Sequence, residues 1–171
     1  MHNRKNLWLI RHSEAKRGAY GNLDSERDLT EKGSQDSLKM KTWLNGLSQK
    51  PEWFWVSPAK RALKTAQILS ENTEAHLILE KTLYLATADQ LLDVIRSSPE
   101  ETKNLAIVAH NPGISDLANS LNCTEKYYFL PTSGIAYFQV DCEWVEITQN
   151  KQYSVDLVLL KSLSAEFNQK P

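Results

Sequence analysis

The sequence lacks most of the features that mark secreted, membrane or nucleic-acid-binding proteins. It has two cysteines, Cys123 and Cys142, in neither a CxxC nor another metal-ligand spacing. With no apolar signal region at the N-terminus, a reducing cytoplasm is the expected location. No apolar run approaches the roughly 20 residues of a membrane-spanning helix. The formal net charge of -1 predicts no general attraction to nucleic acid or to a membrane.

What remains is the composition of a globular protein. The 171 residues are 41% hydrophobic and 24% charged, a balance that allows a sizeable buried core. The chain contains no internal repeat, low-complexity run or recognisable linker. We therefore expect a single domain over residues 1–171.

Short apolar segments predict the strands. Those bounded by polar residues are typical of buried parallel strands, and they cover residues 7–10, 53–56, 76–79 and 105–109. Later strands are predicted at residues 135–140, 144–148 and 154–160, and the last two are close enough to form an antiparallel hairpin at a sheet edge.

Helix-start signals follow the first strands. Thr30 and Asn111 are candidate caps, Ser57-Pro58 combines a cap with a first-position proline, and Thr87 with Gln90 fits a capping box. Strands that alternate with helices predict a three-layer α/β/α sandwich with a mainly parallel central sheet and an antiparallel edge strand.

Arg11 and His12 stand directly after the first strand, where ligands bind in open α/β sheets. A neutral imidazole keeps a lone pair for nucleophilic attack, and a guanidinium binds phosphate oxygens at two points. The pair therefore suits attack on phosphorus. The alternative is a surface arginine beside a structural histidine.

Two further segments carry similar groups. Arg61 lies in the first turn of its helix, where the dipole favours anions, unless Lys60 and Lys64 mark only a solvated basic face. His110 ends a strand as His12 does, or is simply a buried, hydrogen-bonded histidine. Arg27 is either a phosphate clamp or the partner of a neighbouring carboxylate, such as that of Asp24, Glu26 or Asp28.

Four segments in this order resemble the histidine phosphatase superfamily. They are Leu9-Ile10-Arg11-His12, Arg27-Asp28-Leu29-Thr30-Glu31-Lys32-Gly33, Ser57-Pro58 through Thr65-Ala66, and Val108-Ala109-His110-Asn111-Pro112. The short chain is most similar to the compact branch of SixA-like phosphohistidine phosphatases. The last third of the chain matches only as generic strands.

The resemblance implies a role for each matched residue. His12 would be the nucleophile and carry a transient phosphohistidine, while Arg11, Arg61 and His110 bind the phosphoryl oxygens. Arg27, Ser13, Ser57 and Asn111 would complete the phosphate site. The family needs no metal or other cofactor, because arginine and histidine supply the positive charge.

The sequence departs from the family pattern at three points. Ser13 replaces the usual glycine, and Asp28 replaces a common proline. The third departure concerns the general acid, for which the nearest candidates are Glu80 and Asp89. Neither lies in a convincing motif, and Asp89 equally suits a stabilising position in the first turn of a helix. A weak acid function favours a leaving imidazole over a leaving alkoxide, because imidazole is the far weaker base.

These features predict a phosphatase that acts on protein phosphohistidine and releases inorganic phosphate. Residues 16–27 form the one candidate lid, and an open site suits a phosphohistidine on a protein surface. The alternatives are a phosphatase for small phosphoesters with the same fold, and a non-catalytic phosphate-binding module. A mutase is disfavoured, because no large insertion encloses the substrate.

Overall fold

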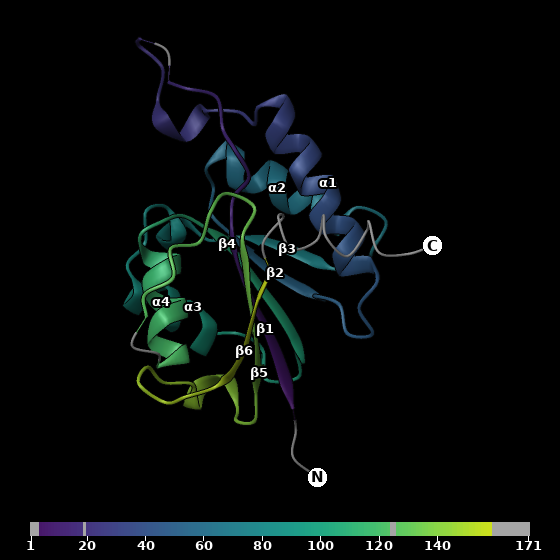
Figure 1. The fold of residues 1–171 in the computed structure, drawn as a ribbon, viewed down its shortest axis with the longest axis vertical. Helices are drawn as coiled ribbons and strands as arrows, with labels where there is room; N and C mark the ends of the chain where they lie inside the picture. The colour runs from purple at the N-terminus through teal and green to yellow at the C-terminus, as the bar shows by residue number, and fades with distance from the viewer. Residues whose placement is uncertain (1–3, 19, 124–125, 159–171) are drawn as a thin grey trace.

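A six-stranded sheet forms the centre of the protein in a computed structural model, which describes residues 4–18, 20–123 and 126–158. The strand order is β3 (His76–Leu79), β2 (Trp53–Val56), β4 (Asn104–Ala109), β1 (Lys5–Arg11), β5 (Ile135–Val140) and β6 (Ser154–Val158). The first four strands are parallel, β5 is antiparallel to β1, and β6 is antiparallel to β5 (Figure 1).

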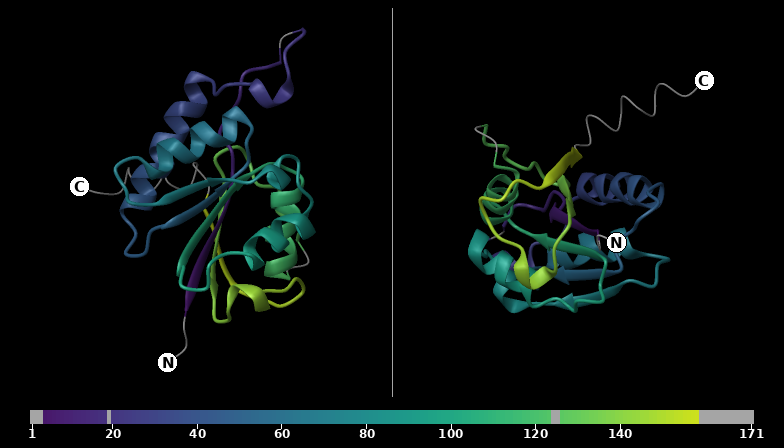
Figure 2. Two further views of the ribbon diagram at one scale, coloured as in Figure 1. Left: turned by 180° about the vertical axis from the view of Figure 1, so that it is seen from behind. Right: turned by 90° about the horizontal axis from the view of Figure 1, so that it is seen from below.

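Four helices cover the two faces of this sheet. Helices α1 (Glu31–Asn45) and α2 (Lys60–Ser70) pack together on one face, and α3 (Ala88–Arg96) and α4 (Gly113–Asn122) pack on the other (Figures 1 and 2). The architecture is the predicted mixed α/β sandwich of three layers. Among the helices of the described residues, none has both the length and the apolar character to cross a bilayer.

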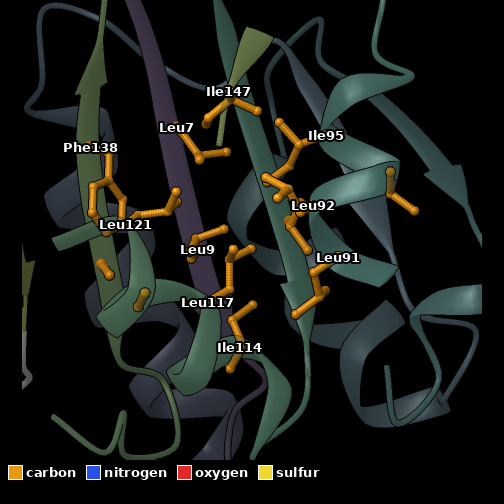
Figure 3. Packing of buried hydrophobic residues seen from close by; sticks show 14 of the residues in the cluster. Leu7, Leu9, Leu91, Leu92, Ile95, Ile114, Leu117, Leu121, Phe138 and Ile147 are labelled. Atoms are coloured by element: carbon orange, nitrogen blue, oxygen red, sulfur yellow. The ribbon is translucent and has the colours of Figure 1, made fainter. Parts of the chain in front are cut away.

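The alternation of side chains along β1 divides the core in two. Leu7 and Leu9 face α3 and α4, where they pack with side chains such as Leu92 and Leu117 (Figure 3). Trp8 belongs to the second cluster, under α1 and α2. Because both faces of the strand are covered, its sequence is apolar throughout, as in other central parallel strands.

Two of the predicted helix starts are confirmed. The Thr30 hydroxyl accepts a hydrogen bond from the backbone N–H of Gly33, and α1 begins at the next residue after this cap. Thr87 and Gln90 form the reciprocal capping box at the start of α3. In both cases the sequence signal is local, since the cap and its partner lie three residues apart.

The other two predicted caps are wrong. Helix α2 begins at Lys60 and has no side-chain cap, because the Ser57 hydroxyl pairs with Nε2 of His110 at 2.7 Å and otherwise accepts from the N–H of Ala59, before the helix, at 3.4 Å. Helix α4 begins at Gly113, after the cis Asn111-Pro112 bond and without a side-chain cap. The Asn111 amide instead donates to the carbonyl of Leu130 and accepts from Ser115. Ser57 and Asn111 therefore bind mainly groups that are distant in sequence or one turn into the helix. They do not cap the first backbone N–H groups of their helices, as the sequence predicted.

The strand predicted at residues 144–148 is also wrong, and with it the hairpin at the edge. This segment contains the short 3-10 helix η3 (Trp144–Glu146), and β6 pairs with β5 instead. The Glu100 carboxylate accepts hydrogen bonds from the backbone N–H groups of Trp144 and Val145. The buried indole of Trp144 donates to the carbonyl of Thr102. These contacts hold the segment outside the sheet. Residues 159 and 160 of the predicted last strand lie outside the described residues.

Gly33 fixes the start of α1 against the segment that follows β1. A Cβ atom at this position would lie 2.1 Å from the carbonyl oxygen of Glu14, a backbone atom that has no rotamer by which to move away. Thr30 also donates its backbone N–H to that carbonyl, at 3.0 Å. The close approach therefore sets where the chain leaves the end of β1.

We expect Gly33→Ala to lower the free energy of unfolding by about 2 kcal/mol or more, because the added methyl group forces two backbone segments apart. Gly46→Ala is the matched control at the other end of α1, where the new Cβ lies at an ordinary 3.4 Å from its nearest neighbour and φ is -79°. Urea denaturation of both variants checks this. Equal stabilities for the two variants would contradict the steric account.

Candidate active site

Two histidines meet where β1 and β4 end. These strands are paired in parallel, with Arg11 opposite Ala109, so His12 and His110 leave the sheet side by side. Their ring centroids are 5.0 Å apart, and both side chains are buried. The loop between β1 and α1 extends beyond this end of the sheet (Figure 1). The site therefore lies at the carboxyl edge, as the sequence predicts.

Hydrogen bonding fixes the tautomer of His12. Its Nδ1 lies 2.7 Å from the carbonyl oxygen of Ser13, and a carbonyl only accepts, so Nδ1 carries the proton. Nε2 then keeps a lone pair, which accepts a hydrogen bond from Nε of Arg61 at 3.3 Å. Nε2 is thus unprotonated and lies next to a cation.

Helix α2 supplies Arg61, which is 4% exposed. Its other two nitrogens bind Asp24 in the loop between β1 and α1. Nη1 donates to the Asp24 carbonyl at 2.7 Å, and Nη2 donates to its carboxylate at 2.9 Å. One turn along the helix, the Thr65 hydroxyl donates to the Arg61 carbonyl and accepts from the backbone N–H of Ser13. Arg61 is therefore fixed from both ends.

His110 has one bonded ring nitrogen and one without a partner. Nε2 pairs with the hydroxyl of Ser57 at 2.7 Å. Within the described residues no group hydrogen bonds to the buried Nδ1. The ring also meets Tyr84 edge to face, with centroids 5.7 Å apart. A buried polar atom without a partner is costly, so it gains from any ligand that reaches it.

Arg11 lies at the same edge of the sheet. Its Nη1 donates to the carbonyl of Leu130 at 2.8 Å, and its guanidinium lies 5.4 Å from the ring centroid of Phe129. Its buried Nε has no partner among the described residues. Burial lowers the pKa of Arg11 from its usual value, although an arginine remains charged at neutral pH.

Ser13 lies in a buried cluster of hydroxyl groups. Its Oγ is 2.6 Å from Oγ of both Ser37 and Ser133, so its side chain has two close partners within the protein. The backbone N–H of Ser13 donates to Thr65 rather than remaining free. The replacement of glycine is accommodated because serines from α1 and from the segment before β5 surround the extra hydroxyl.

Arg27 is linked to Arg61 through the carboxylate of Asp24. Its Nη1 forms an ion pair with Asp24 at 2.9 Å, and its Nε donates to the carbonyl of Lys16. Since Asp24 also binds Arg61, the two arginines share one counter-ion. The salt bridge that the sequence offered as one interpretation of Arg27 is therefore formed, and the role of a phosphate clamp stays a prediction.

The two candidate acids bind other partners. Glu80 accepts hydrogen bonds from the backbone and hydroxyl of Thr82, which lower the pKa of its carboxyl group. Asp89 accepts from the side chain of Gln149. The carboxylate that does meet the arginines is Asp24. Sequence reasoning considered Asp24 only as a salt-bridge partner of Arg27, because the contact with Arg61 spans 37 residues.

Burial sets the ionisation of both histidines. It lowers the pKa of His12 to about 4, an effect opposed by the Ser13 carbonyl and reinforced by Arg61 and Arg11. Burial, His12 and Arg61 likewise lower the pKa of His110 to about 3. Both rings are thus neutral at pH 7, the state in which an imidazole is a nucleophile. Among the described residues, no three His, Cys, Asp or Glu side chains gather as metal ligands do.

A neutral, buried histidine pair flanked by arginines at the carboxyl edge of an α/β/α sheet defines an anion site of the phosphate-handling class. The model of the histidine phosphatase superfamily (branch 1) matches residues 7–84, which include His12, Arg27 and Arg61. Over residues 7–84 the chain is therefore similar to the histidine phosphatase superfamily, and its fold is that of solved phosphatases.

Solved structures share this fold. A proposed phosphohistidine phosphatase SixA from Agrobacterium tumefaciens is 20% identical, with a TM-score of 0.79 over 91% of this chain and 97% of that one. The protein histidine phosphatase SixA complexed with tungstate is 22% identical, with a TM-score of 0.73 over 88% and 94%. Phosphoserine phosphatase from Entamoeba histolytica is 20% identical, with a TM-score of 0.61 over 93% and 99%. No curated protein matches the chain by sequence.

We expect the imidazoles of His12 and His110 to titrate near pH 4 and pH 3 rather than near 6.5. Because the unfolded chain binds these protons at higher pH than the folded protein does, their burial lowers stability progressively as the pH falls below about 6.5. NMR titration of the ring signals, assigned with His12→Asn and His110→Asn, measures both values. A midpoint above 6 for either ring would contradict the account.

Proposed function

We propose that the protein is a metal-independent phosphatase that forms a phosphohistidine on His12 and acts on phosphohistidine carried by proteins. The observation that carries the proposal is the state of His12. Its Nδ1 donates a proton to the Ser13 carbonyl, and its Nε2 is unprotonated. Arg61 lies beside Nε2. This arrangement joins an activated nucleophile to a group that stabilises negative charge.

The reaction then takes two displacements. Nε2 of His12 attacks phosphorus, the P–N bond of the substrate breaks, and the substrate imidazole leaves with the bonding electron pair and takes a proton from water. Water next attacks the phosphorylated His12, the new P–N bond breaks, and inorganic phosphate departs. Arg11, Arg61 and His110 bind the phosphoryl oxygens in both steps, where charge develops.

Unpartnered donors support a phosphoryl ligand at this place. Nε of Arg11 and Nδ1 of His110 are buried and have no hydrogen-bond partner within the described residues. If Ser57 donates its hydroxyl proton to Nε2 of His110, then Nδ1 carries the ring proton and can donate it to a phosphoryl oxygen. A bound phosphoryl group would satisfy groups that are otherwise costly to bury.

The proton supply supports a phosphohistidine substrate. The carboxyl groups of Glu80 and Asp89 are held by Thr82 and Gln149, and Asp24 is held by arginines that lower its pKa. An alkoxide leaving group requires a proton donor in the transition state, whereas a leaving imidazole requires far less assistance. The site thus suits phosphoramidates better than phosphoesters.

The rim of the site supports a protein as the carrier. Most of the exposed large apolar side chains of the described residues lie in the loops at the carboxyl end of the sheet. They are Tyr20, Leu23, Leu85, Tyr127, Tyr128 and Phe129. Phe129 also covers the guanidinium of Arg11. Exposed apolar surface that borders a reactive site is typical of a docking surface for a macromolecule.

A small phosphoester is the second candidate substrate. It is favoured by the fold shared with phosphoserine phosphatase of Entamoeba histolytica, whose structure was solved in complex with 3-phosphoglyceric acid. That candidate requires an acid, whereas the carboxyl groups of Glu80, Asp89 and Asp24 are held by other partners. A panel of substrates therefore decides between the two candidates.

The test measures phosphate release from a phosphohistidine-carrying protein, from phosphoramidate and from small phosphoesters, all with a chelator present. We expect the wild type to act fastest on the phosphohistidine protein and His12→Ala to lose at least about a thousandfold, because the nucleophile is absent. His76→Ala is the matched control, since His76 lies on β3 at its amino end, away from the site.

Each other outcome rejects part of the proposal. Fastest release from one small ester makes the protein a metabolite phosphatase. Activity that disappears with chelator rejects the metal-independent reaction. Phosphate binding without turnover of any substrate makes the chain a binding module. Full activity of His12→Ala rejects the covalent intermediate.

Ser57 offers a separate test of His110. We expect Ser57→Ala to lower kcat on the phosphohistidine substrate by about tenfold, because the ring loses the hydroxyl that orients it and selects its tautomer. Ser57→Thr keeps the hydroxyl and should retain more activity than the alanine variant. Steady-state kinetics of the two variants checks this, and equal kcat values would contradict a positioning role for the hydroxyl.

A further inference from the structure

Asp24 gathers the charged groups of the site around one carboxylate. Arg61 donates to its Oδ2 at 2.9 Å and Arg27 to its Oδ1 at 2.9 Å. The hydroxyl of Tyr84, which follows the 3-10 helix η2 (Lys81–Leu83), donates to Oδ2 at 2.9 Å. Three separate segments of the chain thus contribute donors to this one side chain. These hydrogen bonds, that of Arg27 first, hold the pKa of Asp24 below its usual range, so the group is an anion.

The carboxylate shares one edge of Arg61 with the nucleophile. Nε and Nη2 form the side edge of a guanidinium, and their N–H groups point the same way. Nε donates to Nε2 of His12, and Nη2 donates to Oδ2 of Asp24. A phosphoryl group attacked by Nε2 must bring its oxygens to this same edge. An Asp24 oxygen therefore occupies a position that a phosphoryl oxygen would take.

We propose that Asp24 competes with the phosphoryl group for Arg61 and Arg27 and so lowers the affinity of the site for phosphate. The proposal rests on the proposed function in one respect, that phosphate binds beside His12. Asp24 supplies an anion to both arginines in the structure. When a phosphoryl group enters, its oxygens replace Oδ2 on Arg61, and the carboxylate turns outward.

The position of Asp24 permits this exchange. Its side chain is 47% exposed, so turning outward hydrates the carboxylate without taking a charge through the core. The 3-10 helix η1 (Asp24–Glu26) is one turn long and buries none of its residues. The side chain of Arg61, by contrast, is 5% exposed, and its guanidinium also donates to Nε2 of His12 and to the backbone carbonyl of Asp24. The carboxylate moves more easily than the guanidinium does.

Competition of this kind weakens the hold on inorganic phosphate. Each phosphate ion must break ion pairs before it forms its own, which favours rapid release of the product. A phosphorylated protein meets the same cost, but its contacts with the rim add binding free energy that offsets it. The carboxylate thus keeps the affinity for free phosphate low, while a phosphoryl group on a larger carrier still binds through its additional contacts.

The test is isothermal titration calorimetry of inorganic phosphate with the wild type, Asp24→Asn and Glu26→Gln. The asparagine keeps the shape of the side chain and removes its charge. We expect it to bind phosphate tighter by about tenfold, because charge-assisted hydrogen bonds no longer compete. Glu26→Gln removes the same charge from the same 3-10 helix at an exposed residue, and we expect the affinity of the wild type.

Affinity in Asp24→Asn that is equal to or weaker than in the wild type overturns the proposal, and a weaker affinity makes Asp24 a positioning residue for the arginines. A tenfold gain in both variants also overturns it, since the effect is then general electrostatics. If the wild type releases phosphate from substrates while Asp24→Asn shows no gain, only the competition is rejected. Absence of phosphate binding in every protein rejects the competition and the phosphate site together.

Discussion

The parallel pairing of β1 with β4 is the constraint on which the site depends. It sets Arg11 opposite Ala109, and therefore places His12 and His110 on adjacent chains at one edge of the sheet. At the other end of the same pair, the buried side chain of Asn6 donates to that of Asn104 at 2.8 Å. A slip of the register would separate the two histidines and break this hydrogen bond, so the packing of the pair and the histidine contact require the same alignment.

Around this pair, the protein controls ionisation mainly by burial. Arg11 and Arg61 lie near His12 and attract anions. The His12 ring itself is kept neutral, because a further buried cation beside these arginines is too costly. Nδ1 donates its proton to the Ser13 carbonyl, which leaves Nε2 as the unprotonated nitrogen. Asp24 balances part of the positive charge from the exposed side. In the proposed reaction the nucleophile His12 needs no deprotonation at Nε2. The arginines supply the positive charge that a metal ion would otherwise provide.

The sequence allowed most of the fold to be predicted, because the signals were local. Strands β2, β3 and β5 have their predicted bounds, and the caps at Thr30 and Thr87 act through residues three positions away. The predictions that were wrong concern polar groups with several partners within reach. Ser57 and Asn111 are good helix caps by residue type, yet each binds other partners. The segment at 144–148 reads as a strand until Glu100 takes its backbone N–H groups.

The sequence by itself determined which reactive groups exist and at which end of which strand they stand. Histidines and arginines placed directly after apolar segments must emerge at the carboxyl edge, since parallel strands end together. Only the tertiary structure decided which ring nitrogen of His12 carries a proton, that Ser57 serves His110, and that Asp24 lies on Arg61. Apart from the contact between His12 and its neighbour Ser13, these contacts connect residues that are tens of positions apart in the sequence. They are made by three-dimensional distance, burial and charge, which no local pattern of residues encodes.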